Sequence, residues 1–222
     1  MSKKTPRPRS SKPTVSRVRN RRFLAIVAGA AAVAVLAVVL ALSNTGAPDG
    51  DAVAVVNGQR ITAQDVEDMQ IRYRLFYERD IEFLQALERL ISDELLYRAA
   101  TPDYLVSYDE AQQELEAQLE RDGLTLEELK AELRWNGIVY EEYVQTFRRE
   151  LAIADYLDDV VTVTEEEARE RYEELAKIPG IELPSFEDME YQIIINIKQE
   201  KIVRLIKDLE QQADVVRYVN SG

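Results

Sequence analysis

The pattern of hydrophobic and polar positions divides the chain into one long apolar run and, after it, several segments with the periodicity of amphipathic helices. Residues 23–43, FLAIVAGAAAVAVLAVVLALS, form a run of 21 residues without a charged side chain. Because a helix rises about 1.5 Å per residue, this run is long enough to cross the roughly 30 Å hydrocarbon core of a bilayer. Nine Lys or Arg residues and no acidic residue precede it, and such positive charge holds its side of a first span in the cytoplasm. The pattern therefore predicts a transmembrane signal-anchor in the cell membrane, with the rest of the chain extracytoplasmic.

A cleaved signal peptide is the alternative interpretation of the same run. Ala41-Leu42-Ser43 fits a small-x-small cleavage site. However, the apolar core of a signal peptide is usually about 7–15 residues long, which favours the uncleaved anchor. The remaining divisions follow from composition: 1–22 is a basic, disordered cytoplasmic tail, 44–51 is a polar linker, and 52–222 is one domain large enough for a hydrophobic core.

Helical periodicity dominates the domain after the linker, where apolar residues recur every three or four positions. Most of the expected helix starts carry a Ser or Thr followed three residues later by an acidic residue, which is a capping-box pattern. We expect helices near 62–100, either continuous or broken around Arg79-Asp80, and near 107–122, 125–136, 138–160, 164–177 and 185–213.

Two β-rich segments flank these helices. The first, AVAVVNGQRIT at 52–62, contains the turn signal Asn57-Gly58, and the second, DVVRYV, covers 214–219. Both are too short to be stable alone, so we expect 53–56 to pair with 214–219 and to close the domain. The predicted fold class is thus mainly α, with two short paired terminal β-strands, on a single N-terminal transmembrane helix.

Composition and charge exclude most kinds of catalytic or metal site. The chain has no Cys and no His, which removes thiol nucleophiles, disulfides, the commonest general base and the commonest metal ligand. It also lacks a GxxxxGK[ST] phosphate loop. After residue 22, 19 basic residues stand against 41 acidic ones, a net charge of −22, and such a surface repels nucleic acid. We therefore expect no catalytic residue, no metal, no cofactor and no nucleic-acid partner.

The order of the segments resembles a known family. AVAVVNGQRIT, LERLISDELLYRAA, DGLTLEELKAELRWNGIVYEEYVQTFRREL and VTVTEEEARERYEEL are similar, in that order, to the N-terminal chaperone region of the SurA/PrsA/trigger-factor-like isomerase chaperones. FEDMEYQIIINIKQEKIVRLIKDLEQQADVVRYV is similar to the helix and strand that close this region. In catalytic members a parvulin domain lies between these parts, whereas here only the nine residues AKIPGIELP (176–184) do. The resemblance implies a chaperone without peptidyl-prolyl isomerase activity.

Aromatic side chains are the candidates for a polypeptide-binding groove. Amphipathic Tyr and Trp and soft Met side chains suit an adaptable surface, although ordinary core packing explains most stripes at helical spacing. The candidate substrate-binding residues are Met69, Tyr73, Phe76, Tyr77, Phe83, Trp135, Tyr140, Tyr143 and Phe147. We expect an ATP-independent chaperone for unfolded or newly translocated polypeptides, held to the membrane by 23–43. The alternative is a structural adaptor that binds one fixed envelope partner.

Overall fold

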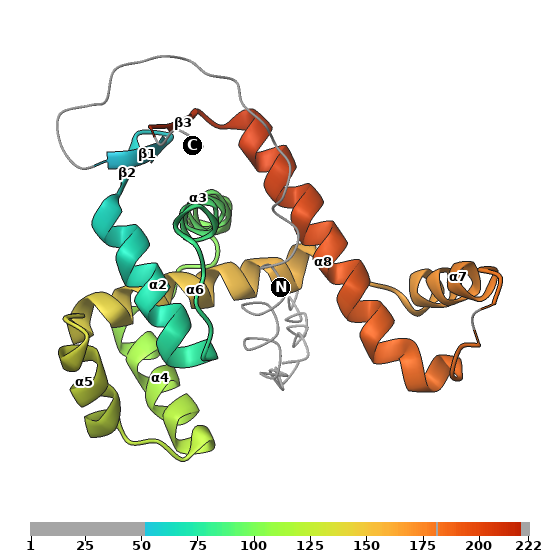
Figure 1. Cartoon of the computed structure of the whole chain (residues 1–222), viewed down its shortest axis with the longest axis horizontal. Coiled ribbons are helices and arrows are strands. Elements are labelled where there is room, and N and C mark those ends of the chain that lie inside the picture. Colours follow the sequence, from blue (N-terminus) through green and yellow to red (C-terminus); the bar gives the residue numbers. More distant parts are fainter. Residues whose placement is uncertain (1–51, 181, 219–222) are drawn as a thin grey trace, which may run out of the picture.

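The computed structural model describes residues 52–180 and 182–218. Within these residues the fold is mainly helical, with one small sheet, as the sequence predicts (Figure 1). The elements in chain order are β1 (Ala52–Val56), β2 (Gln59–Thr62), α2 (Ala63–Tyr77), α3 (Phe83–Ala100), α4 (Tyr108–Asp122), α5 (Leu126–Trp135), α6 (Tyr140–Val160), α7 (Glu165–Ala176), α8 (Phe186–Gln212) and β3 (Val215–Arg217).

The helices begin and end where the local chemistry of the sequence predicts. Complete capping boxes start α2, α4, α5 and α7, each with a Ser or Thr that accepts a hydrogen bond from the third helical amide. The expected break in the first long helical stretch is present, because Glu78 adopts a left-handed conformation (φ 51°) and ends α2. A left-handed Gly123 ends α4 in the same way.

The sheet corrects one expectation, because it has three strands in the order β2-β1-β3 rather than two. The pairing of the terminal strands is confirmed, with Val56 opposite Val215 in an antiparallel register. The additional strand β2 exists because Asn57 and Gly58 both take positive φ (48° and 83°) and form a two-residue hairpin turn. The chain thus returns along β1 before α2 begins, and buries Ile61 in the process.

Helix α3 lies at the centre of the main body, with the sheet and α2 on one side and α6 and α8 on the other (Figure 1). One hydrophobic cluster joins the sheet, α2 and α3, and a second joins α4, α5 and α6. A third holds the C-terminal half of α8 against α3 and α6 through Leu96, Ile153 and Leu157.

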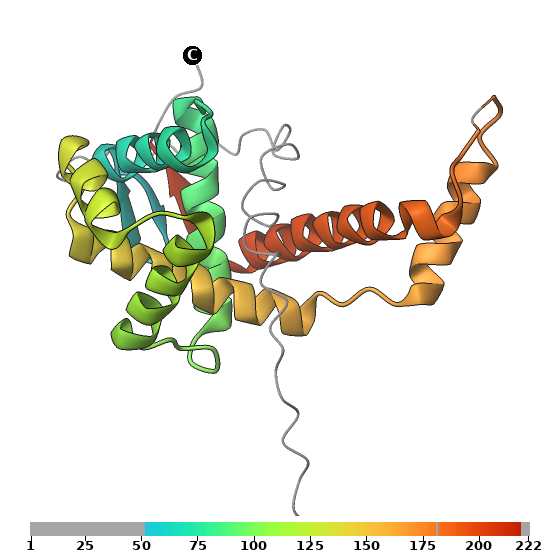
Figure 2. The same cartoon turned by 90° about the horizontal axis from the view of Figure 1, so that it is seen from below.

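The N-terminal half of α8 extends away from this body as an arm, and α7 packs against it at the far end (Figure 2). The arm has its own small core around Phe186, Ile193 and Ile197. Arg171 also donates two hydrogen bonds of 2.7 and 2.8 Å to the Glu200 carboxylate. The α7–α8 hairpin is therefore a packing unit distinct from the body.

The expected tail (1–22), anchor (23–43) and linker (44–51) lie outside the described residues. Among the helices that the structure does describe, none is both long and apolar enough to span a membrane.

Candidate functional site

A pocket of about 220 Å³ lies between β2, α2, α3 and α6. Aliphatic side chains such as Ile61, Leu90 and Ile153 form part of its lining, and most of the other lining side chains are polar or charged. It is positioned by the β1–β2 hairpin and by the packing of α2 and α6 on α3. The pocket therefore offers both apolar contact and hydrogen-bonding groups.

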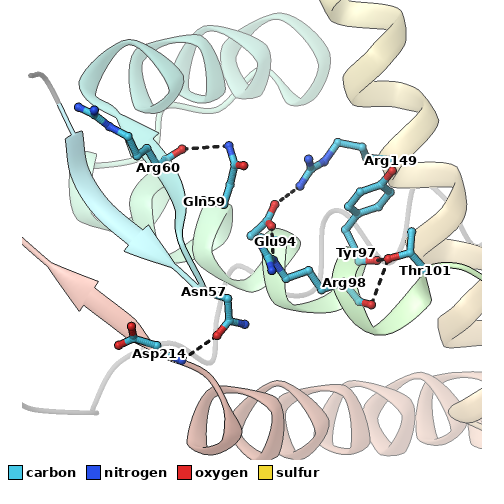
Figure 3. Close-up of polar contacts among 9 residues, drawn as sticks. All are labelled: Asn57, Gln59, Arg60, Glu94, Tyr97, Arg98, Thr101, Arg149 and Asp214. Carbon is cyan, nitrogen blue, oxygen red and sulfur yellow. Dashed lines mark hydrogen bonds and ion pairs between the residues drawn. The ribbon is translucent and has the colours of Figure 1, made fainter.

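One wall of the pocket is fixed by Glu94 on α3, whose side chain is buried (Figure 3). Arg98 donates a 2.6 Å hydrogen bond to one carboxylate oxygen, and Arg149 from α6 binds the other. The Arg149 guanidinium also lies over the Tyr97 ring, 4.2 Å from its centroid. Because the buried carboxylate is satisfied on both oxygens, this wall is rigid and ties α3 to α6.

The lining of the pocket also holds a looser ion pair, between Arg72 on α2 and Glu150 on α6. The Arg72 Nη1 and Glu150 Oε1 atoms are 3.7 Å apart, beyond hydrogen-bond distance. The Glu150 side chain is 46% exposed and its carboxyl is partly desolvated. This desolvation raises the pKa of Glu150, while the positive charges of Arg72 and Arg89 oppose the shift.

An aromatic cluster, made of Tyr73, Phe76, Tyr77 and Tyr143, joins α2 to the start of α6 beside this pair. The ring centroids of Tyr73 and Tyr77 are 5.1 Å apart, and those of Phe76 and Tyr143 are 5.5 Å apart, both within the range of favourable ring contacts. Tyr143 also lines the pocket. Burial, followed by the negative charge of Glu150, raises the pKa of Tyr77 to about 12. The cluster is thus adjacent to the pocket, and two of its four rings reach solvent, since Phe76 is 41% and Tyr77 is 36% exposed.

The structure distributes the nine candidate residues from the sequence over three environments. Met69, Tyr73 and Phe147 are buried in the hydrophobic clusters, and Met69 also lines the pocket. Phe83, Tyr140 and Tyr143 are half-buried. Phe76, Tyr77 and Trp135 are exposed, Trp135 by 87% at the end of α5. Of these nine residues, Met69 and Tyr143 line the pocket, and Tyr73, Phe76 and Tyr77 belong with Tyr143 to the aromatic cluster beside it.

Sequence reasoning missed the charged residues of this site, Arg72, Glu94, Arg149 and Glu150. Each lies in an amphipathic helix rich in charged residues, where a charged side chain normally faces solvent. The sequence pattern of one helix does not show that these residues meet, because Glu94 and Arg149 are 55 positions apart and Arg72 and Glu150 are 78 positions apart.

The described residues contain no group of His, Cys, Asp or Glu side chains arranged to hold a metal ion.

Comparison with solved structures adds a likeness in fold. No protein-family model and no curated protein matches the sequence. Among solved structures, a Campylobacter jejuni chain is similar over 77% of this chain and 100% of its own, with 14% identity and a TM-score of 0.46. That structure belongs to work on the virulence factor PEB4 and the periplasmic protein Cj1289, which are described as two structurally related SurA-like chaperones.

Proposed function

We propose that this protein is an ATP-independent chaperone that binds unfolded or newly translocated polypeptides outside the cytoplasm. Residues 23–43 anchor it in the membrane and hold the binding site near emerging chains. The observation that carries this proposal is the exposed aromatic cluster beside the pocket. A helical domain with a purely structural role gains nothing from exposed Phe76 and Tyr77 side chains, whereas a polypeptide-binding protein needs such a surface.

The site suits polypeptide segments of varied sequence. Aromatic rings supply large contact areas at low conformational-entropy cost, and Met69 adds a side chain that adapts its shape. The net charge of −22 after residue 22 keeps molecules apart in solution despite the apolar surface. Exchange of bound segments occurs by simple dissociation.

The proposal includes no prolyl isomerase activity. Helix α7 ends at Ala176 and α8 begins at Phe186, so the connection has no length for a domain of about 50 residues or more. We expect the full chain to leave the rate of prolyl cis–trans exchange in a test peptide unchanged. A clear acceleration in an NMR exchange assay contradicts this part of the proposal.

Suppression of aggregation tests the chaperone function. The full chain, reconstituted in lipid nanodiscs, is mixed with a chemically unfolded model protein that aggregates on dilution, and light scattering is recorded. We expect the wild type to reduce scattering at near-stoichiometric ratios, and the double variant Phe76→Ser/Tyr77→Ser to require several-fold more protein. Tyr191→Ser is the matched control, because Tyr191 is an exposed aromatic residue (56%) on the arm.

Two outcomes overturn the proposal. The first is the absence of any effect of the wild type on scattering. The second is crosslinking in cells to one saturable partner instead of many unfolded chains, which identifies the protein as an adaptor.

A further inference from the structure

Arg72 has unused hydrogen-bonding capacity inside the pocket. Its side chain is 13% exposed, and its guanidinium carries five N–H donors. The Glu150 carboxylate lies 3.7 Å away, and Met69 Sδ, a weak acceptor, lies 3.7 Å from Nη2. The buried Nε has no hydrogen-bond partner among the described residues. Arg72 is therefore held in the lining of the pocket without a strong acceptor at hydrogen-bond distance.

Glu150 has hydrogen-bond acceptors that no donor among the described residues occupies at hydrogen-bond distance. Its carboxylate accepts hydrogen bonds, and its charge partner in the pocket is the distant Arg72 guanidinium. Three other acidic groups of the pocket have close partners: Glu94 binds two arginines, Asp93 pairs with Arg89 at 3.0 Å, and Asp65 accepts from the backbone and hydroxyl of Thr62. The loose pair thus combines an acceptor and a donor on facing helices.

We propose that Arg72 and Glu150 bind one peptide unit of the client backbone. This inference rests on the proposed function and names the part of the polypeptide that the pocket recognises. A peptide unit carries one N–H donor and one C=O acceptor. Glu150 accepts the hydrogen bond from the N–H group, and the Nη groups of Arg72 donate to the carbonyl oxygen.

The charge of the pair favours the backbone over a charged side chain. A carboxylate alone binds Lys or Arg side chains best, and a guanidinium alone binds Asp or Glu side chains best. A guanidinium next to a carboxylate instead matches an uncharged ligand group that has one hydrogen-bond acceptor and one donor. Every residue except proline offers such a group. The neighbouring aromatic cluster contacts the side chains that flank the bound peptide unit, so the site binds many sequences in the same way.

Ester substitution in the ligand tests this mode directly. The probe is a fluorescent ten-residue peptide of apolar and aromatic residues, made as a series in which each amide in turn becomes an ester. An ester removes one N–H donor and weakens the carbonyl acceptor but keeps the side chains. Binding to the full chain in nanodiscs is measured by fluorescence anisotropy. We expect one or two ester positions to weaken binding by about three- to tenfold, as the loss of a hydrogen bond does.

Two variants connect this effect to the pair. Arg72→Met and Glu150→Met keep the length of the apolar stem and remove the polar end. We expect both to bind the parent peptide more weakly. Glu150→Met loses most of the difference between amide and ester ligands, because it removes the acceptor for the peptide N–H group. Arg72→Met reduces this difference, because it removes the donors to the carbonyl oxygen. Arg74→Met is the control on the same helix, because Arg74 pairs with Asp80 on the surface (Arg74 Nε to Asp80 Oδ1, 2.8 Å). Circular dichroism melting confirms that each variant is folded, and either one is sufficient for the test.

The outcomes separate this inference from the proposed function. Binding that is equally strong for every ester ligand overturns the backbone mode and leaves the chaperone proposal intact. A second result also overturns it: a Lys introduced into the peptide raises the affinity, this gain is lost in Glu150→Met, and ester substitution has no effect. Glu150 is then a subsite for cationic side chains. No binding of any peptide by the wild type overturns both proposals.

Discussion

Individual charged residues around the pocket differ in how completely they are paired, and this difference is the basis of the structural and binding roles that we propose for them. Glu94 is 6% exposed and accepts hydrogen bonds from Arg98 and Arg149. Glu150 and Arg72 meet only at 3.7 Å. A buried carboxylate without partners is costly, so the first arrangement stabilises the fold. The second leaves donors and acceptors available for a ligand.

Replacement of Glu94 by Gln tests its structural role. The change removes the charge that holds Arg98 and Arg149 at the pocket wall. We expect the free energy of unfolding to fall by about 1–3 kcal/mol, the usual value for a hydrogen bond to a charged group. Urea denaturation measures the loss. Glu173→Gln, at an exposed position of α7, is expected to change stability by less than about 0.5 kcal/mol.

The pH dependence of stability tests the environment of Glu150. Desolvation raises its pKa above the ordinary value of 4.5 in the folded protein. At a pH between the pKa of Glu150 in the unfolded chain and its raised pKa in the folded protein, the folded state holds more protons than the unfolded state. The free energy of unfolding therefore falls as the pH rises through this interval. Glu150→Gln removes the titration. We expect the unfolding free energy of the variant, relative to wild type, to increase from pH 4 to pH 8. A constant difference over this range contradicts the desolvated state of Glu150.

At the scale of single elements, capping decides where the helices start. Helix α5 has only ten residues, too few to be stable alone in water. It depends on its packing through Leu129 and Leu133 and on the hydrogen bond from the Glu128 amide to the Thr125 hydroxyl. The side of the body formed by α4, α5 and α6 is therefore sensitive to this cap.

Thr125→Ala is expected to lower the free energy of unfolding by about 1 kcal/mol, since alanine cannot cap the α5 amides. For a domain of this size the melting temperature falls by about 2–4 °C. Thr125→Ser keeps the hydroxyl and serves as the control. Equal melting temperatures for the Ala and Ser variants refute the role of this cap.

The elements show why so much of the helical pattern is predictable. Ser107, Thr125 and Thr164 each bind the third amide of their helix, an interaction within four residues of sequence. Strand β2 lies within the predicted β-rich segment 52–62 but was not expected as a separate strand, because only four residues lie between the turn and α2. Its conformation depends on the hairpin turn and on the partner strand β1.

At the scale of the whole molecule, the sheet joins the two ends of the described chain. Strand β3 pairs with β1, and Arg217 binds Glu88 on α3 (2.7 and 2.8 Å) and Glu210 on α8 (2.8 Å). The closing strand thus connects the sheet, the central helix and the long arm helix. Its loss affects the entire body.

A chain that ends at Gln212 tests this closure. We expect its melting temperature to fall by more than about 5 °C in a single transition, because the edge of β1 is exposed and α8 loses its attachment to the sheet. Arg217→Met, which removes only the ion pairs, is expected to cause a smaller decrease. An unchanged melting temperature for the shortened chain shows that β3 does not close the domain.

The sequence by itself determined the helical character of the domain, nearly all helix boundaries and the pairing of 53–56 with the C-terminal segment. These features depend on periodicity, caps and turns, which act over a few residues, and on the presence of only two β-rich segments. Aromatic residues on α2 and α6 were also found as candidates from their type alone. Only the tertiary structure decided which of them are exposed, since Tyr73 is 8% and Phe76 is 41% exposed although both lie on α2.

The tertiary structure alone also placed Arg72 against Glu150 and Glu94 against Arg149. The physical reason is that ion pairs between helices depend on how α2, α3 and α6 pack in three dimensions. Helix packing is set by the fit of many apolar side chains together, and no local pattern in the sequence records which charged residues it brings to one pocket.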